Sequence, residues 1–225
     1  MSVYTWNQKC AVSAAAAMFT LATASAALAQ NTSGADAATP IEVRGGTASF
    51  DVGTNVPALS VHGKSSALEA RGRVRPTPSG PQLEHLEATV PVNTLATGMG
   101  LRDSHMRKYV FTTSDGQTPD VKFVAKTSTC EKSGSNQSTC QVAGDLSIRG
   151  TARPFSIAMK VIESGDSYRA SGEGIVKLSA YGIPQPSQLG VHTDDDVKLR
   201  LEVTARPAPV ATSGVKTAGK TGEKR

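Results

Sequence analysis

The segment that decides the fold is residues 142–161, which read VAGDLSIRGTARPFSIAMKV. In each half, apolar residues alternate with smaller or polar ones, the period-two pattern of a strand with one buried face. Residues 149–154 favour a turn, because Gly150 accepts positive φ and Pro154 has no amide hydrogen to donate to a ladder. The segment therefore predicts a β-hairpin. A hairpin alone is marginal in water, so further strands are expected.

Most of the remaining chain repeats this alternation. Residues 98–111 are an exception, because their apolar residues recur at helical spacing, which predicts a short helix. Proline- and glycine-containing loops are expected at 76–81 and 181–190. We thus predict an all-β fold of eight or nine antiparallel strands with one short helix, closed as an extended barrel or packed as a sandwich. The other predicted strands span residues 46–52, 58–62, 65–74, 86–92, 121–130, 168–178 and 197–205.

The apolar faces of these strands are unusually rich in small residues. Small side chains pointing inward leave room for a ligand, which favours a barrel with a cavity. The alternative is that the glycines mark bends and bulges, and the pattern alone leaves both interpretations open. The positions concerned are Ala70, Gly72, Ala88, Gly144, Ala170, Gly172 and Gly174.

The two ends of the chain differ in composition from its middle. Residues 1–29 hold one charge, Lys9, then an alanine-rich apolar run ending in a small-x-small site at Ala27 to Ala29. This predicts a signal peptide cleaved after Ala29, with a membrane anchor as the alternative, and hence a periplasmic or secreted protein. Residues 30–44 are expected to be a linker and residues 45–205 the folded domain. Residues 206–225 are predicted to be a disordered basic tail, with weak contact to an anionic membrane surface as the alternative role.

Two cysteines, Cys130 and Cys140, remain after the predicted cleavage. An even number in an exported protein indicates a disulfide, across the polar residues 131–139. A redox or metal-binding pair is the alternative.

Charge argues against a nucleic-acid partner. Of the net charge of +5, Lys9 contributes one and residues 206–225 contribute four, which leaves residues 30–205 neutral. A neutral domain offers no basic footprint for phosphates. We therefore expect no nucleic acid to bind.

Nothing in the sequence predicts an enzyme, a metal site or a cofactor. The G-x-S-x-G, H-E-x-x-H and P-loop motifs are absent. The four histidines, at 62, 85, 105 and 192, have no metal-ligand spacing. The cluster of Arg102, Asp103 and His105 is interpreted as a helix cap, or else as a site for a ligand headgroup. Residues 194–196, three aspartates, are interpreted as a solvated turn, with calcium binding as the alternative.

Several motifs, taken in order, resemble the YceI-like family. The ordered set covers roughly residues 45–205, and it departs from the family where an F-F pair is replaced by Val110 and Phe111. The motifs are LRDSHM at 101–106, YVF at 109–111, PDVKF at 119–123, GDLSIRGT at 144–151, YGI at 181–183 and DDV at 195–197.

The resemblance implies a lipocalin-like extended antiparallel β-barrel that is exported and binds a polyisoprenoid chain in an apolar pore. We expect the helix to border this pore, and Arg102 and His105 to meet a polar headgroup. The alternative function is a periplasmic stress or interaction protein whose barrel is filled and takes no lipid. The candidate wall residues are Phe50, Val90, Phe123, Phe155, Ile157 and Met159, and the candidate mouth residues are Leu101, Met106, Phe111 and Tyr181.

Overall fold

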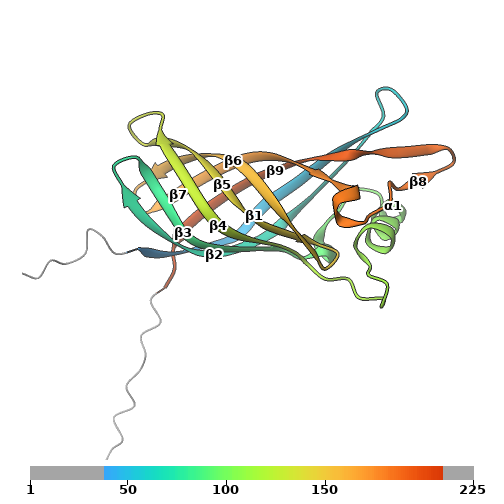
Figure 1. Cartoon of the computed structure of the whole chain (residues 1–225), viewed down its shortest axis with the longest axis horizontal. Coiled ribbons are helices and arrows are strands. Elements are labelled where there is room, and N and C mark those ends of the chain that lie inside the picture. Colours follow the sequence, from blue (N-terminus) through green and yellow to red (C-terminus); the bar gives the residue numbers. More distant parts are fainter. Residues whose placement is uncertain (1–37, 210–225) are drawn as a thin grey trace, which may run out of the picture. The chain divides into compact units, whose positions relative to one another are not determined.

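A computed structural model describes residues 38–209 of the chain. Nine strands follow one another with one α-helix, a π-helical turn and two 3-10 turns (Figure 1). The strands are β1 (Thr39–Thr54), β2 (Ser60–Thr77), β3 (Gly80–Val90), β4 (Val121–Lys132), β5 (Gln137–Ile148), β6 (Thr151–Ser164), β7 (Ser167–Lys177), β8 (Ser187–Gln188) and β9 (Val191–Pro207). The helical elements are η1 (Val92–Thr94), α1 (Gly100–Met106), η2 (Arg107–Phe111) and η3 (Leu178–Tyr181).

The strands form one antiparallel sheet that closes on itself. Strands β1 to β6 each pair with the next strand in sequence, β7 pairs with β9, and β9 pairs with β1. The short strand β8 pairs only with β9, as an extension beside the closed barrel. Closure leaves no free sheet edge around the ring of eight strands. The predicted all-β barrel with one short helix is confirmed, and the sandwich is not formed.

The hairpin of residues 142–161 is present, but its turn is tighter than predicted. Arg149 and Gly150 alone connect β5 to β6, and both have positive φ, 53° and 75°. Two positive φ values in a two-residue loop match the right-handed twist of the flanking strands. Pro154, expected in the turn, lies within β6 opposite Asp145. The strand tolerates this proline because β6 pairs with β7 only from Ala158 onward.

Long-range pairing extends several strands beyond their predicted bounds. β1 begins at Thr39, so residues 39–44 belong to the barrel and not to a linker; Ile41 and Val43 are buried there. β9 continues to Pro207, and residue 206 pairs with Glu42 of β1. Residues 206 and 207 therefore belong to the barrel and not to the predicted tail. β2 is one strand and not two, although its pairing with β1 shifts in register near Leu68. Between the two cysteines, residues 131–132 and 137–139 are likewise strand.

The inward glycines make room for neighbouring side chains at some positions and permit a bulge at others. A Cβ added at Gly174 would lie 2.7 Å from the ring of Phe155, so that glycine makes space for an aromatic side chain. At Gly144 an added Cβ would clash with the backbone of Val124, beside a register shift in the β4–β5 pair. Glycines at the first kind of position admit large wall residues, and those at the second kind permit a bulge.

Cys130 and Cys140 lie opposite each other on β4 and β5 and form the predicted disulfide. It joins residues ten apart in sequence, and Cys140 is buried. Replacing both cysteines by serine is expected to lower the free energy of unfolding by about 2–3 kcal/mol, because the unfolded chain gains freedom. Urea unfolding of both proteins, with and without reductant, measures this. Reductant should destabilise only the wild type; a serine variant as stable as the oxidised wild type would contradict the expectation.

The predicted signal peptide, residues 30–37 of the linker and residues 210–225 of the tail lie outside the described residues. Within residues 38–209, none of the helices has the length and apolar character needed to cross a bilayer.

Candidate ligand cavity

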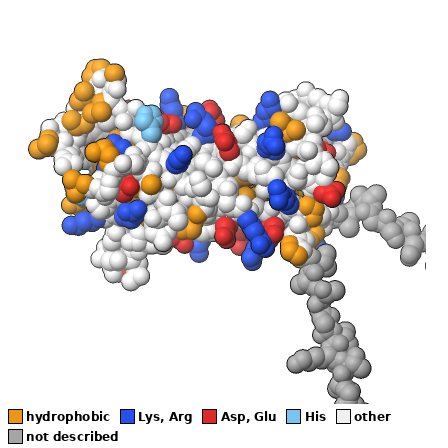
Figure 2. Space-filling model, turned by 180° about the vertical axis from the view of Figure 1, so that it is seen from behind, with side chains coloured by type: hydrophobic (Ala, Val, Ile, Leu, Met, Phe, Trp, Pro, Cys, Tyr) orange, Lys and Arg blue, Asp and Glu red, His pale blue; other side chains and the backbone are white. Residues whose placement is uncertain are grey.

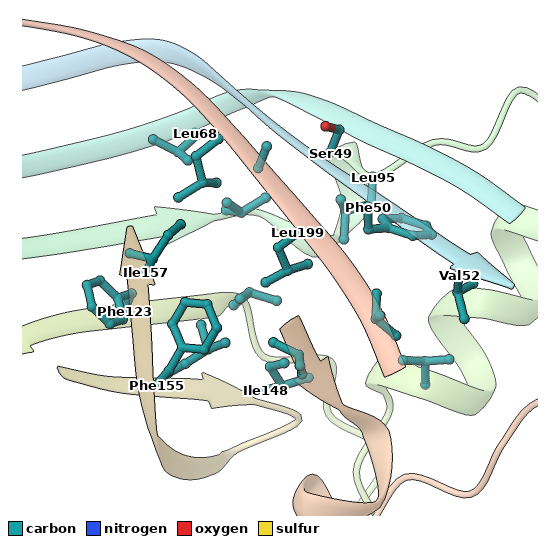
Figure 3. Close-up of a pocket in the computed structure, with 18 of the residues that line it drawn as sticks. Ser49, Phe50, Val52, Leu68, Leu95, Phe123, Ile148, Phe155, Ile157 and Leu199 are labelled. Carbon is teal, nitrogen blue, oxygen red and sulfur yellow. The ribbon is translucent and has the colours of Figure 1, made fainter. Parts of the chain in front are cut away.

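A cavity of about 1330 Å³ runs through the barrel. Side chains from β1 to β7 and from β9 line it, together with residues of α1, η2 and the β8 segment. Figure 3 shows part of this wall, where apolar side chains from several strands point into one space. The volume lies above the ~300–1,000 Å³ range of ordinary small-molecule sites. The interior is therefore hollow and suits a large, apolar occupant.

All six predicted wall residues lie on the cavity surface. The rings of Phe123 on β4 and Phe155 on β6 meet edge to face, with centroids 6.0 Å apart, and Ile157 lies beside them (Figure 3). Phe50 lies on β1, Val90 at the end of β3 and Met159 on β6. Each occupies an inward position of its strand because side chains alternate between the two faces.

The last strand contributes a row of wall residues that the sequence reading did not select. These are Val197, Leu199, Leu201 and Val203 on β9. Their alternation with polar, mostly charged residues places them on one face of β9. The alternation does not reveal that β9 pairs with both β1 and β7. This pairing closes the barrel, so the apolar face of β9 lines the cavity.

The helix borders one end of the cavity, which we call the mouth. Leu101 and Met106 of α1 and Phe111 of η2 line it, as expected for mouth residues. Tyr181 is the exception: it lies in η3, is 6% exposed, packs in the hydrophobic core and does not line the cavity. Its predicted place at the mouth is therefore wrong. The 3-10 turn after β7 folds the ring into the core, an arrangement that strand periodicity does not encode.

Charged groups on the cavity wall are confined to the mouth. Among the described residues that line the cavity, Arg102 and His105 are the only members of the Asp, Glu, Lys, Arg and His set. Two nitrogens of Arg102 are engaged: Nε donates to Thr97 Oγ1 (2.8 Å) and Nη2 donates to the Thr97 carbonyl (2.7 Å). The ring of His105 meets Tyr109 edge to face at 5.7 Å. A polar group that entered here would meet a guanidinium and an imidazole, whereas a chain farther in would meet apolar atoms.

Asp103 holds the start of α1 in place. Its carboxylate, on a residue only 8% exposed, accepts hydrogen bonds from the Thr97 amide (2.7 Å) and hydroxyl (2.5 Å). These bonds from Thr97, helped by the nearby Arg107 and Arg102, lower the pKa of the Asp103 carboxyl, although burial opposes them. Arg102 also binds Thr97, so both side chains hold the helix to this loop, and Arg102 still lies on the cavity wall. The helix is tied back to the loop before it, but the predicted helix cap is not formed, because the N-cap residue Met99 makes no side-chain capping bond.

Replacing Asp103 with asparagine is expected to destabilise the protein by about 2 kcal/mol at pH 7, the scale of hydrogen bonds to a charged group. Because the pKa is lowered in the folded state, the charged carboxylate adds stability above its unfolded pKa of about 3.9. That contribution is lost as the pH falls through the folded pKa. Urea unfolding at pH 7 and at successive pH values below 4 should show the gap between wild type and variant shrinking.

The control for this comparison is Asp166→Asn, which removes the same charge in the exposed β6–β7 turn. It should change the unfolding free energy by less than about 0.5 kcal/mol. A gap between wild type and Asp103→Asn that stays constant down to acidic pH would contradict the role of the charged carboxylate.

The three aspartates at 194–196 lie within β9, so the predicted solvated turn is wrong, because pairing with β1 and β7 extends the strand through them. Two of them make local contacts. Asp195 accepts hydrogen bonds from the amide and hydroxyl of Ser179, both 2.7 Å, which lower the pKa of its carboxyl. Asp196 pairs with Lys177 at 2.5 Å. Across residues 38–209, no three His, Cys, Asp or Glu side chains gather in a way that holds a metal ion. The calcium interpretation thus finds no support in this part of the chain.

Solved structures share this fold. A polyisoprenoid binding domain from Saccharophagus degradans, 10% identical, aligns with a TM-score of 0.56 over 75% of this chain and 98% of its own. BcnA of Burkholderia cenocepacia, 19% identical, aligns with a TM-score of 0.52 over 70% and 95%. A Campylobacter jejuni YCEI protein, 21% identical, gives 0.52 over 69% and 90%. At these identities the similarity describes the fold.

Sequence relatives and a family model extend the comparison. A UPF0312 protein of Pseudomonas aeruginosa is 30% identical over 129 residues, which cover 55% of this chain and 63% of that protein. The chain thus matches somewhat less than two thirds of the length of this relative. The model of the YceI-like domain matches residues 40–205, most of the chain and essentially the whole barrel. The chain therefore belongs to the YceI-like family.

Proposed function

We propose that this protein is an exported lipid-binding protein that holds a polyisoprenoid, or a similar long amphiphile such as a quinone, inside its barrel. The apolar chain lies along the wall of Phe123, Phe155 and Leu199, and the polar head lies near Arg102 and His105. The observation that carries this proposal is the largely apolar cavity of about 1330 Å³, where Arg102 and His105 at the mouth are the only Asp, Glu, Lys, Arg or His side chains among the described lining residues. The polyisoprenoid binding domain of Saccharophagus degradans, which has the same fold, supports this class of ligand.

The energetics favour a long chain over a short one. Each buried methylene contributes about 0.8 kcal/mol, whereas association costs roughly 4–15 kcal/mol in lost freedom. About ten buried methylenes are therefore needed to offset an association cost of about 8 kcal/mol, near the middle of this range. A small apolar molecule would leave most of this cavity unfilled and gain too little.

Export fits the leader-like composition of residues 1–29 and the disulfide, which persists in oxidising compartments such as the periplasm. No catalysis or cofactor is part of the proposal, because the described wall carries no Asp, Glu, Lys, Arg or His away from the mouth. The alternative of a filled barrel acting through its surface is disfavoured by the same cavity.

Native mass spectrometry of the protein purified from the cells that make it, with lipid extraction of what co-purifies, tests the proposal. The expected result is a bound species of isoprenoid or quinone mass, and a mass shift when a long isoprenoid alcohol is added to delipidated protein. A short-chain isoprenoid alcohol is the control and should bind much more weakly. Delipidated protein that shows neither a mass shift nor a change in thermal melting with any isoprenoid would contradict the proposal.

A further inference from the structure

Exposed apolar side chains concentrate at the mouth of the barrel. Within residues 38–209, eight large hydrophobic side chains are exposed, and six of them belong to segments around the mouth. Figure 2 shows hydrophobic side chains gathered at one end of the barrel, with Lys and Arg side chains beside them. Scattered apolar side chains are normal on a protein surface, but a gathered set marks an interaction site. We define the apolar rim as Val56, Leu59, Met99, Leu101, Tyr109 and Leu189.

Hydrogen bonds hold the two hairpin tips of the rim together. The Asn55 amide donates to the His192 carbonyl (3.1 Å), and the His192 amide donates to Asn55 Oδ1 (2.9 Å). The side-chain amide of Asn55 also donates to the Gly190 carbonyl (3.2 Å). The β1–β2 tip, with Val56, is thus fixed beside the β8–β9 tip, where Leu189 is 96% exposed. These hydrogen bonds therefore hold the exposed side chain of Leu189 in a defined position on the surface.

The rim is continuous with the cavity. Five of its six members also line the cavity wall: Leu59, Met99, Leu101, Tyr109 and Leu189. A long apolar chain that left the cavity would therefore cross the rim. If the rim faced water at that moment, the emerging chain would be exposed to water at a cost that grows with each methylene. An apolar phase that covers the rim removes this cost, and the source of such lipids is itself a bilayer.

The charge around the rim selects the kind of bilayer. The segment 98–111 carries Arg102, Arg107 and Lys108 against one acid, Asp103, which is buried and hydrogen-bonded. The Lys108 ammonium lies 5.3 Å from the centroid of the Tyr109 ring, which is 53% exposed. A tyrosine with a neighbouring lysine suits the headgroup region, where the ring lies among apolar atoms and the ammonium reaches phosphates. The helix side of the mouth thus complements anionic lipids.

We propose that the apolar rim is a docking surface for an anionic bilayer, at which the mouth faces the membrane and the cavity exchanges its lipid. The exchange rests on the proposed function of the cavity, whereas the docking itself is measured independently of any cargo. Of the aspartates on β9 near the mouth, Asp196 pairs with Lys177, whereas Asp194 and Asp195 form no ion pair within the described residues. We therefore expect the anionic headgroups to meet the helix side of the rim, where the basic residues lie.

Vesicle co-sedimentation tests the docking. The probe is large unilamellar vesicles of phosphatidylethanolamine and phosphatidylglycerol, with phosphatidylcholine vesicles as the uncharged comparison. We expect Leu189→Asp and Val56→Asp to lower the vesicle-bound fraction at least tenfold. The matched control is Ile175→Asp, an equally drastic change at a 58% exposed residue that does not line the cavity, and it should bind as the wild type does. Circular dichroism establishes that each variant is folded. Mass spectrometry establishes that all variants have the same N-terminus and the same C-terminal tail, so that neither end accounts for a difference in binding.

The outcomes separate docking from cargo binding. Folded rim variants that sediment with vesicles as the wild type does would overturn the docking surface. So would a wild type that ignores vesicles and instead forms dimers lost in Leu189→Asp, since the rim would then join two copies of the chain. If lipid loads into the cavity in solution but no vesicle binds, only the docking fails. If vesicles bind through the rim but no lipid loads, the docking stands and the proposed function fails.

Discussion

The double variant Ala48→Phe, Ala88→Phe should lose at least about 100-fold in affinity for a long isoprenoid while remaining folded. Both alanines line the cavity, on β1 and β3, and are only partly buried, so each added ring occupies space that a ligand chain would use. A ligand that loses four buried methylene contacts loses about 3 kcal/mol, which is roughly 100-fold in Kd. The fold should tolerate the rings because both alanines border the cavity, which has room for the added atoms.

The measurement is titration of delipidated protein with the isoprenoid that co-purifies. Binding is followed by native mass spectrometry or by displacement of a fluorescent lipid probe. The matched control is Ala158→Phe, the same change at an exposed position on the outer face of β6. It should bind lipid as the wild type does. If the inner variant stays folded and binds with unchanged affinity, the cavity is not where the lipid lies.

Gly144→Val should be the most damaging single change to the fold among those considered, lowering the free energy of unfolding by about 3 kcal/mol. A Cβ at this position would lie 2.8 Å from the Ala125 Cα and clash with the Val124 carbonyl. Those atoms are backbone and cannot rotate away, so the β4–β5 ladder would have to separate at its bulge. For a domain of this size the loss corresponds to about 10 °C in Tm.

Ala143→Val is the control, since it adds a similar side chain at the next residue, on the opposite face of β5. It should cost less than about 1 kcal/mol, because β-branched residues suit strands. Thermal and urea unfolding of the three proteins measures both effects. Equal stability of Gly144→Val and Ala143→Val would show that β4 moves aside without cost and would refute the close approach.

Alternation along each strand was enough to predict which side chains point inward. Phe123, Phe155 and Ile157 were selected as wall residues because period-two spacing assigns a residue to a face before any partner strand is known. The helix over 98–111 and the disulfide were predicted for equally local reasons, a change of period and an even cysteine count. These features depend on neighbours in the chain, so the sequence by itself determines them.

Features that depend on contacts between distant segments were decided by the tertiary structure. The first strand begins at Thr39 because Ile41 pairs with both Gly72 on β2 and Pro207 on β9, which no local pattern reveals. Closure of β9 onto β1 converts a row of apolar faces into one cavity. The same folding buries Tyr181 and brings the tips of two hairpins together at the mouth through Asn55. Periodicity assigns each side chain to a face, whereas the volume enclosed by those faces exists only once the sheet has closed.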